Sequence, residues 1–264
     1  MIKILPSNQA CGATVTGVDL SRKLDTAVLR AVRSAWLEHH VLAFPDQTLT
    51  NADLEQIVQS LGVFGSEPYF EPMAGSEHVV ALTRKADEKA PLFAENWHSD
   101  WSFMPKPPIG TCLYSRVIPP IGGDTGFINQ QKALAEMPAA LRAKIEGRIA
   151  LHSAAGAYAP DGMYGEKDRA AGRSMAIRYS EDARDVCGHP FILQHPESAR
   201  ETLLGCLGYI IGVEGMTDDE ALPLLLELHQ WQTREEFQYS HKWEKNMFVI
   251  WDNRSLLHKA NGGY

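Results

Sequence analysis

Cysteine is scarce in this sequence, and the few cysteines are not grouped. Of 264 residues, the cysteines are Cys11, Cys112, Cys187 and Cys206, and no two of them form a C-x-x-C pair. Structural zinc sites and disulfide frameworks need cysteines at characteristic spacings. The observed spacing argues against both. We therefore expect reduced thiols and a cytoplasmic protein.

Long apolar runs and an excess of basic residues are also lacking. No window approaches the ~18 consecutive apolar residues of a transmembrane helix, and the opening stretch MIKILPSNQACGATVTGVDL has no apolar core like that of a secretory signal. Lys and Arg number 25 against 33 Asp and Glu, which gives a net charge of −8. Broad nucleic-acid binding requires a basic face. We therefore expect neither a membrane nor a nucleic acid as partner.

Internal repeats, low-complexity tracts and linkers are absent as well, so we expect one domain over residues 1–264. The hydrophobic content of 44% is enough for a sizeable core. Short apolar or alternating segments bounded by Pro and Gly predict strands. They lie at residues 13–21, 41–47, 78–84, 110–118, 122–129, 189–196 and 247–253.

Apolar residues at helical spacing, with capping residues before them, predict helices at 25–40, 50–62, 130–147 and 217–233. Pro138 should interrupt the third of these. Residues 154–173 are rich in Gly, Ala and Pro, which is typical of a long loop or lid. The helices do not alternate regularly with the strands. The pattern therefore favours a mainly β sandwich or barrel with flanking helices over a doubly wound sheet.

The stretch ENWHSDWSF, residues 95–103, places two strong polar groups among aromatic residues. If it is extended, His98 and Asp100 point to one face and Ser99 points to the other. Such a pair fits two interpretations, a buried hydrogen-bonded pair and part of a metal site. Two histidines and one carboxylate are the ligands of non-heme Fe(II) oxygenases, and they leave coordination positions open. His258, in WDNRSLLHKANGG, is the best third ligand.

Four further stretches form a pattern along the chain: GATVTGVDLS, NWHSDWSFMPKPPIGTCLYSRVIPPIGGDTGFIN, HPFILQHPESAR and IWDNRSLLHKAN. In this order, and over nearly the whole chain, they resemble the taurine dioxygenase (TauD/TfdA-like) family of Fe(II)/2-oxoglutarate-dependent dioxygenases. The resemblance implies a double-stranded β-helix core of the jelly-roll, cupin-like type. It also implies hydroxylation of a C–H bond in a small, anionic substrate such as a sulfonate, sulfate ester or aryloxyalkanoate. Fe(II), 2-oxoglutarate and O2 would take part, with succinate and CO2 as products, and a homo-oligomer is plausible.

The same resemblance assigns roles position by position. His98, Asp100 and His258 would bind Fe(II) as the catalytic triad. Thr125 would hydrogen-bond the distal carboxylate of 2-oxoglutarate, and Trp251 would line the cosubstrate pocket. Taken alone, Thr125 is a turn residue and Trp251 a core residue.

Substrate contacts are harder to assign. Taurine-specific members carry a histidine and a tyrosine at positions that align with Glu67 and Phe70, and an asparagine where Ala94 stands. None of these polar groups is retained, so we predict that taurine is a poor substrate. The other expected contacts, each of which also has a structural interpretation, are Phe103, His152, Tyr158 and Tyr164.

One departure from the family concerns an arginine that pairs with 2-oxoglutarate beyond the distal histidine. The sequence ends at Tyr264, six residues after His258, and does not include that arginine. We expect that the natural chain continues past this point. Arg254 precedes the histidine and should point elsewhere.

Two alternatives from other classes use the same three ligands. One is a zinc-dependent hydrolase, since zinc accepts His and Asp ligands and leaves a position for water. This alternative leaves the GGDT turn without a role. The other is a non-catalytic jelly-roll protein that retains the triad as a structural or metal-sensing site.

Overall fold

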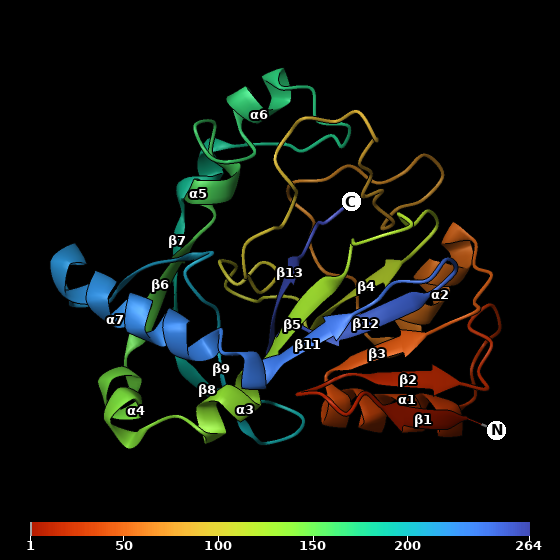
Figure 1. Ribbon diagram of the computed structural model, residues 1–264, viewed down its shortest axis with the longest axis horizontal. Helices are drawn as coiled ribbons and strands as arrows, with labels where there is room; N and C mark the ends of the chain where they lie inside the picture. The colour runs from red at the N-terminus through yellow and green to blue at the C-terminus, as the bar shows by residue number, and fades with distance from the viewer. Residues whose placement is uncertain (1) are drawn as a thin grey trace.

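Two sheets face each other across a shared hydrophobic layer in the computed structural model, which describes residues 2–264 (Figure 1). The five-stranded sheet has the order β1 (Lys3–Pro6), β2 (Ala13–Thr16), β3 (Val41–Phe44), β12 (Phe248–Asp252) and β4 (Gly110–Tyr114). The three-stranded sheet has the order β11 (Gln238–His241), β5 (Thr125–Asn129) and β13 (Leu256–Ala260). Within these sheets only the β2–β3 pair is parallel. The predicted mainly β sandwich is confirmed.

Alternation along the strands produces the layer between the two sheets. Val249 and Trp251 of β12 point into it from one side, and Phe127 of β5 and Leu256 of β13 point into it from the other. All four are at most 2% exposed. Because side chains of a strand alternate between faces, the intervening residues Phe248 and Ile250 pack on the opposite face of the same sheet.

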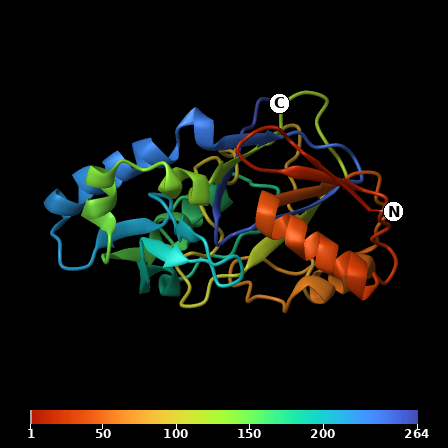
Figure 2. The same cartoon turned by 90° about the horizontal axis from the view of Figure 1, so that it is seen from below.

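Helices α1 (Thr26–His39) and α2 (Asn51–Leu61) cover that outer face (Figure 2). Asp25 caps α1 by accepting a hydrogen bond from the backbone N–H of Val28, and Thr50 forms a capping box with Asp53 at the start of α2. Both helices therefore begin where their capping residues predict, because a side-chain oxygen satisfies an otherwise free N–H group.

A second group of helices covers the outer face of the three-stranded sheet. It contains α3 (Gln130–Ala135), α4 (Ala139–Ile145) and α7 (Asp218–Gln232), which pack against Ile128 and Leu257. Pro138 is the N-cap of α4, so the predicted interruption is confirmed. This lobe also contains a sheet of order β10 (Ile210–Val213), β6 (Ile149–Ser153), β7 (Val186–Pro190) and the hairpin β8 (Ile192–Gln194), β9 (Glu201–Leu203).

The structure departs from the predicted elements in three places. The strand expected at 189–196 is divided between β7 and β8, which belong to different sheets. Residues 78–84 form no strand, and only Val80 makes an isolated bridge, to Pro72. Residues 154–173 contain the short helices α5 (Ala155–Tyr158) and α6 (Glu166–Ala170) at the top of Figure 1. Buried ion pairs of Arg173 with Asp168 and Glu88 fix this segment to the preceding loops. Long-range contacts of this kind cannot be inferred from local composition.

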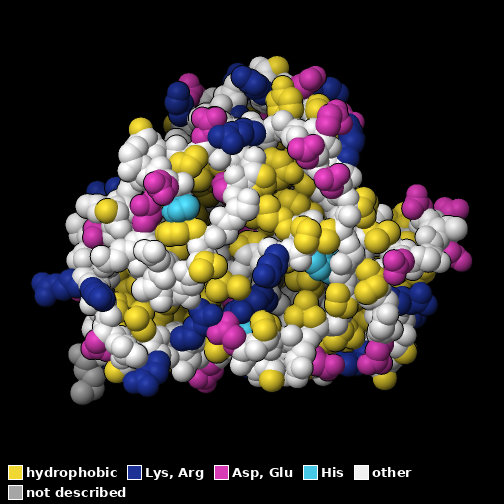
Figure 3. Space-filling model, turned by 180° about the vertical axis from the view of Figure 1, so that it is seen from behind, with side chains coloured by type: hydrophobic (Ala, Val, Ile, Leu, Met, Phe, Trp, Pro, Cys, Tyr) yellow, Lys and Arg dark blue, Asp and Glu magenta, His cyan; other side chains and the backbone are white. Residues whose placement is uncertain are grey.

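Hydrophobic side chains gather on one face of the molecule. Figure 3 shows hydrophobic side chains gathered in the central part of that face, below a top lobe that carries charges of both signs. Among residues 2–264, no helix combines the length and apolar character that a membrane crossing requires.

Truncation of Phe248 should test how far the fold depends on the five-stranded sheet. The Phe248 ring is 0% exposed and packs edge-on against Phe44, with ring centroids 5.9 Å apart. We expect Phe248→Ala to lower the free energy of unfolding by about 3–5 kcal/mol, because a buried ring leaves a cavity. Urea unfolding followed by circular dichroism measures the change.

A matched control is Val117→Ala, since Val117 is 90% exposed and its truncation should leave stability almost unchanged. Equal effects of the two substitutions would contradict this account of the core.

Candidate metal centre

Two histidines far apart in the sequence are joined by a pair of backbone hydrogen bonds. The N–H of His98 donates to the carbonyl of His258 at 3.0 Å, and the N–H of His258 donates to that of His98 at 2.8 Å. His98 therefore pairs with β13 at a single antiparallel bridge. Side chains of directly paired residues lie on the same face, so the two imidazoles are neighbours, with ring centroids 4.2 Å apart.

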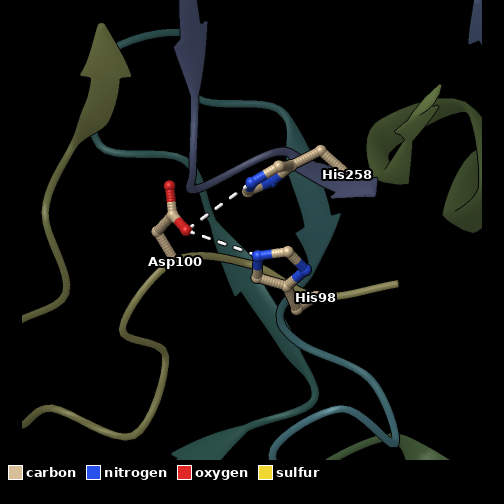
Figure 4. Close-up of side chains that lie close together, drawn as sticks. All are labelled: His98, Asp100 and His258. Carbon is tan, nitrogen blue, oxygen red and sulfur yellow. Dashed lines mark ion pairs between the residues drawn. The ribbon is translucent and has the colours of Figure 1, made fainter. Parts of the chain in front are cut away.

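Asp100 completes a group of three converging side chains (Figure 4). Its Oδ1 lies 3.6 Å from Nε2 of His98 and 3.5 Å from Nε2 of His258. One potential ligand atom from each residue lies within 4.8 Å of the others. Two imidazole nitrogens and one carboxylate oxygen are the donors that suit non-heme Fe(II). The donor set therefore fits the metal that the sequence predicted.

Hydrogen bonding and burial leave both histidines ready to bind a cation. His98 Nδ1 lies 2.8 Å from the backbone carbonyl of Asn96, which can only accept, so Nδ1 carries the proton and Nε2 is free. Burial lowers the pKa of His258 to about 3, and the positive charge of a protonated His98 would lower it further, against the opposing effect of Asp100. The His258 imidazole is therefore neutral at neutral pH, as a metal ligand must be.

Backbone conformation lets the chain bring His98 and Asp100 to this position. Trp101, directly after Asp100, has a φ of 50°, which turns the chain sharply away from the site. Gly208 lies against the other side of the segment, where a Cβ would lie 2.6 Å from the carbonyl oxygen of Trp97 and 3.3 Å from Cβ of His98. A larger residue at position 208 would displace the ligand.

Trp251 contacts His258, and Thr125 lies on the strand that pairs with β13. Trp251 is 2% exposed and packs on the His258 ring, with centroids 4.8 Å apart. Thr125 lies two residues from Phe127, the partner of His258 in the β5–β13 pair. Its Oγ1 accepts a hydrogen bond of 2.9 Å from the indole N–H of Trp243, a residue that the motif analysis missed.

Buried nitrogens without partners occur in the same layer. Nε1 of Trp251 and Nε2 of His241 make no hydrogen bond within the described chain. His241 is the direct partner of Thr125 across β11 and β5. Buried polar groups are normally satisfied, so these unpartnered nitrogens suit the oxygen atoms of a polar ligand. The residues present therefore fit a small acid such as 2-oxoglutarate.

The predicted substrate contacts fall into two groups. Phe70, Tyr158 and Tyr164 belong to a buried aromatic cluster, and Phe103 packs against its edge. Tyr209, which sequence reasoning missed, links this cluster to the metal ligands, because its ring centroid lies 4.9 Å from that of Phe103 and 6.1 Å from that of His98. Its place in a loop before β10 gave no local signal.

His152 and Glu67 lie outside this aromatic cluster. His152 is 0% exposed and its Nδ1 is 3.1 Å from Oγ of Ser102, so it lies in the packed interior. Glu67 accepts a hydrogen bond from the N–H of Tyr69 at the exposed rim. Desolvation raises the pKa of Glu67, and the negative charge of Asp100 acts in the same direction.

Arg254 points away from the three ligands, as expected from its position. It pairs with Asp252 at 2.6 Å and with Glu197 at 2.6 Å, and Asp252 also contacts His195 at 3.0 Å. Asp252 and His195 are each 1% exposed. The network is structural and joins the turn after β12 to the segment after β8.

Two histidines and one carboxylate, from a loop and from β13, are the ligand set typical of non-heme Fe(II) oxygenases. Residues 3–264 match the family described as "Taurine catabolism dioxygenase TauD, TfdA family". The chain belongs to this family, is an Fe(II)- and 2-oxoglutarate-dependent dioxygenase, and has the predicted jelly-roll core. The family assignment supports the dioxygenase interpretation over the zinc-hydrolytic and non-catalytic alternatives.

Individual relatives agree with this assignment. The (S)-phenoxypropionate/alpha-ketoglutarate-dioxygenase of Delftia acidovorans is 31% identical over 98% of this chain and 89% of its own. An alpha-ketoglutarate-dependent sulfate ester dioxygenase of Pseudomonas putida is 30% identical over 96% and 82%. The crystal structure of AAD-2 in complex with Mn(II) and N-oxalylglycine superposes with a TM-score of 0.75 at 26% identity, covering 98% of this chain and 91% of that one.

Removal of one imidazole should abolish metal binding. We expect His98→Ala and His258→Ala to lose high-affinity Fe(II) or Mn(II) binding, because two ligands cannot hold the ion at this site. Isothermal titration calorimetry under anaerobic conditions measures the affinity. The control is His78→Ala, which removes an exposed imidazole from another part of the molecule and should bind like the wild type. Wild-type affinity in His98→Ala would remove His98 from the site.

The free energy of unfolding of the metal-free protein should decrease as the pH is lowered. Burial lowers the pKa of His40 to about 4, of His152 to about 3 and of His241 to about 4. The unfolded chain binds protons at these residues near pH 6.5, so each contributes stability above that pH and loses it as pH falls towards the folded pKa. Below pH 6, each of these histidines should lower the free energy of unfolding by about 1.4 kcal/mol for each pH unit.

Urea unfolding at pH 7, 6 and 5 tests this slope. His152→Gln should have a shallower pH dependence than the wild type, since one titrating group is removed. A stability that stays constant from pH 7 to pH 5 would contradict the burial of neutral histidines.

Proposed function

We propose that His98, Asp100 and His258 bind the Fe(II) of this dioxygenase. The observation that carries the proposal is the convergence of the three side chains on one point, with Nε2 of both histidines within 3.6 Å of Oδ1 of Asp100. No other group of at least three His, Cys, Asp or Glu side chains converges in this way among residues 2–264. The neutral His258 and the oriented His98 support the assignment.

We propose further that 2-oxoglutarate extends from this centre towards Thr125. Two residues along a strand span about 7 Å, which is comparable with the separation of the two carboxylates in a five-carbon diacid. The indole N–H of Trp243 donates to Thr125 Oγ1, so the hydroxyl proton of Thr125 remains available for an acceptor. In this arrangement the Thr125 hydroxyl donates a hydrogen bond to the distal carboxylate of 2-oxoglutarate, and Trp251 packs along the cosubstrate.

Iron bound with 2-oxoglutarate supplies the oxygen chemistry that converts the cosubstrate into succinate and CO2 and hydroxylates a C–H bond. The side chains of the protein would bind and orient the metal and the cosubstrate, and they would exclude water from the site. His98 and His258 bind as neutral ligands and Asp100 supplies negative charge. Trp101, Tyr209 and Phe103 are packed beside the ligands and exclude water from the reaction.

The aromatic cluster supports a small, largely apolar substrate with an anionic group. Phe70 and Tyr158 belong to this cluster and Phe103 packs against it, and Tyr209 connects the cluster to His98. Two relatives are named for phenoxypropionate and for sulfate esters, both organic anions. We therefore propose an aryloxyalkanoate, sulfonate or sulfate ester as the substrate. Taurine is a poor candidate, because Glu67, Phe70 and Ala94 stand where taurine-specific members have a histidine, a tyrosine and an asparagine.

A substrate panel tests this function. The protein is incubated with Fe(II), 2-oxoglutarate and O2, and succinate is measured with phenoxypropionate, an alkyl sulfate, an alkyl sulfonate and taurine. We expect substrate-dependent succinate with at least one of the first three and little with taurine. Anaerobic addition of Fe(II) and 2-oxoglutarate should also give a weak visible charge-transfer band that His98→Ala lacks.

Two results would argue against the proposal. Succinate release that is independent of O2, or no succinate with any compound despite normal iron binding, would reject the dioxygenase site. Rapid taurine turnover would reject the exclusion of taurine while leaving the metal site intact.

A further inference from the structure

The carboxylate of Asp100 is contacted from behind by a short chain of hydrogen bonds. Thr111 Oγ1 lies 2.5 Å from Asp100 Oδ2, and Asn253 Nδ2 lies 2.9 Å from Thr111 Oγ1. The three residues come from separate parts of the sequence, since Thr111 is in β4 and Asn253 is in the turn between β12 and β13. Neither residue belongs to the predicted site.

The direction of donation along this chain is fixed by chemistry. An ionised carboxylate only accepts hydrogen bonds, so the single hydroxyl proton of Thr111 must go to Asp100 Oδ2. Thr111 Oγ1 must then accept from Asn253, which requires the amide nitrogen of Asn253 to face it. The hydrogen bonds therefore run from Asn253 to Thr111 to Asp100, and the opposite amide orientation is excluded.

We propose that Thr111 and Asn253 are positioning residues that restrict Asp100 to one oxygen ligand. Thr111 occupies Oδ2, and the remaining Oδ1 is the oxygen that faces both histidines, at 3.6 Å and 3.5 Å. Two nitrogens and one oxygen leave three positions open in a facial-triad site. A carboxylate that bound through both oxygens would occupy one position needed by the cosubstrate or O2. The inference rests on the proposed metal site.

Backbone contacts make this arrangement rigid. Asn253 is 2% exposed, its N–H donates to the carbonyl of Ile109 at 3.2 Å, and its carbonyl accepts from Ser99 Oγ at 2.6 Å. Asn253, in the turn after β12, therefore contacts both Ser99, the residue before Asp100, and Thr111, which bonds to the Asp100 carboxylate. Thr111 is aligned directly with Trp251 in the β12–β4 pair. The aspartate is thus oriented before any metal binds.

The experiment measures Co(II) binding to the full chain in the absence of 2-oxoglutarate. Thr111→Val keeps the shape of the side chain but removes the hydroxyl, and Thr111→Ser keeps the hydroxyl. We expect Thr111→Val to weaken Co(II) binding about 10–100-fold, the range found for residues that support metal ligands, and Thr111→Ser to bind like the wild type. The visible absorption of bound Co(II), which reports its coordination, should change only in Thr111→Val.

Two further variants separate this role from packing. Thr202→Val is the control, because Thr202 is a strand threonine whose hydroxyl bonds only to the carbonyl of Leu203, away from the metal site. It should bind Co(II) normally. Asn253→Ala removes the donor behind Thr111 and should weaken binding in the same direction, but less than Thr111→Val. Thermal unfolding of each metal-free variant identifies any that fail to fold, and Thr111→Ala replaces Thr111→Val in that case.

Equal Co(II) affinity and absorption in Thr111→Val and the wild type would overturn the proposal, as would equal losses in Thr111→Val and Thr111→Ser. A wild-type protein that binds no Co(II) would overturn both this inference and the metal site. Co(II) binding that depends on the Thr111 hydroxyl, in a protein that releases no succinate, would support the positioning role and reject only the proposed function.

Discussion

The site depends on the backbone bridge that pairs His98 with His258. These two hydrogen bonds join an irregular loop to the edge of β13, and no other described contact places both imidazoles on one face of the sheet. Because the side chains of directly paired residues share a face, the bridge alone determines that the two ligands are neighbours. A shift of one residue in this pairing would turn His98 away and leave the triad incomplete.

The two facing sheets supply the environment that the bridge requires. β13 lies at the edge of the three-stranded sheet, and Trp251 and Phe127 in the layer between the sheets pack on the His258 ring. Burial by these rings keeps the imidazole neutral. The same burial strengthens the attraction of Asp100 for a cation, since a carboxylate in a poorly hydrated site attracts a cation more strongly than one in water. The packing that buries the hydrophobic core therefore also gives His258 and Asp100 the environment that metal binding requires.

Much of this arrangement can be predicted from the sequence. The features that cannot be predicted depend on contacts between residues far apart in the chain. The triad was predictable because His98 and Asp100 are separated by one residue and because the segment around His258 resembles a family motif. The helices followed from local signals such as Asp25 and the Thr50–Asp53 capping box. The expected strand at 78–84 was wrong, since apolar alternation there finds no partner strand. Thr111, Tyr209 and Trp243 were missed because each acts through contacts distant in the sequence.

Asn253 shows how a residue can escape sequence analysis even inside a recognised motif. In WDNR it reads as a turn residue, and it does form the turn between β12 and β13. The same geometry also directs its amide at Thr111, because a tight turn next to β4 leaves the side chain no other buried partner. Structural and functional constraints thus coincide at one position. The turn that returns the chain to His258 also fixes the orientation of Asp100, so all three ligands depend on how β12 connects to β13.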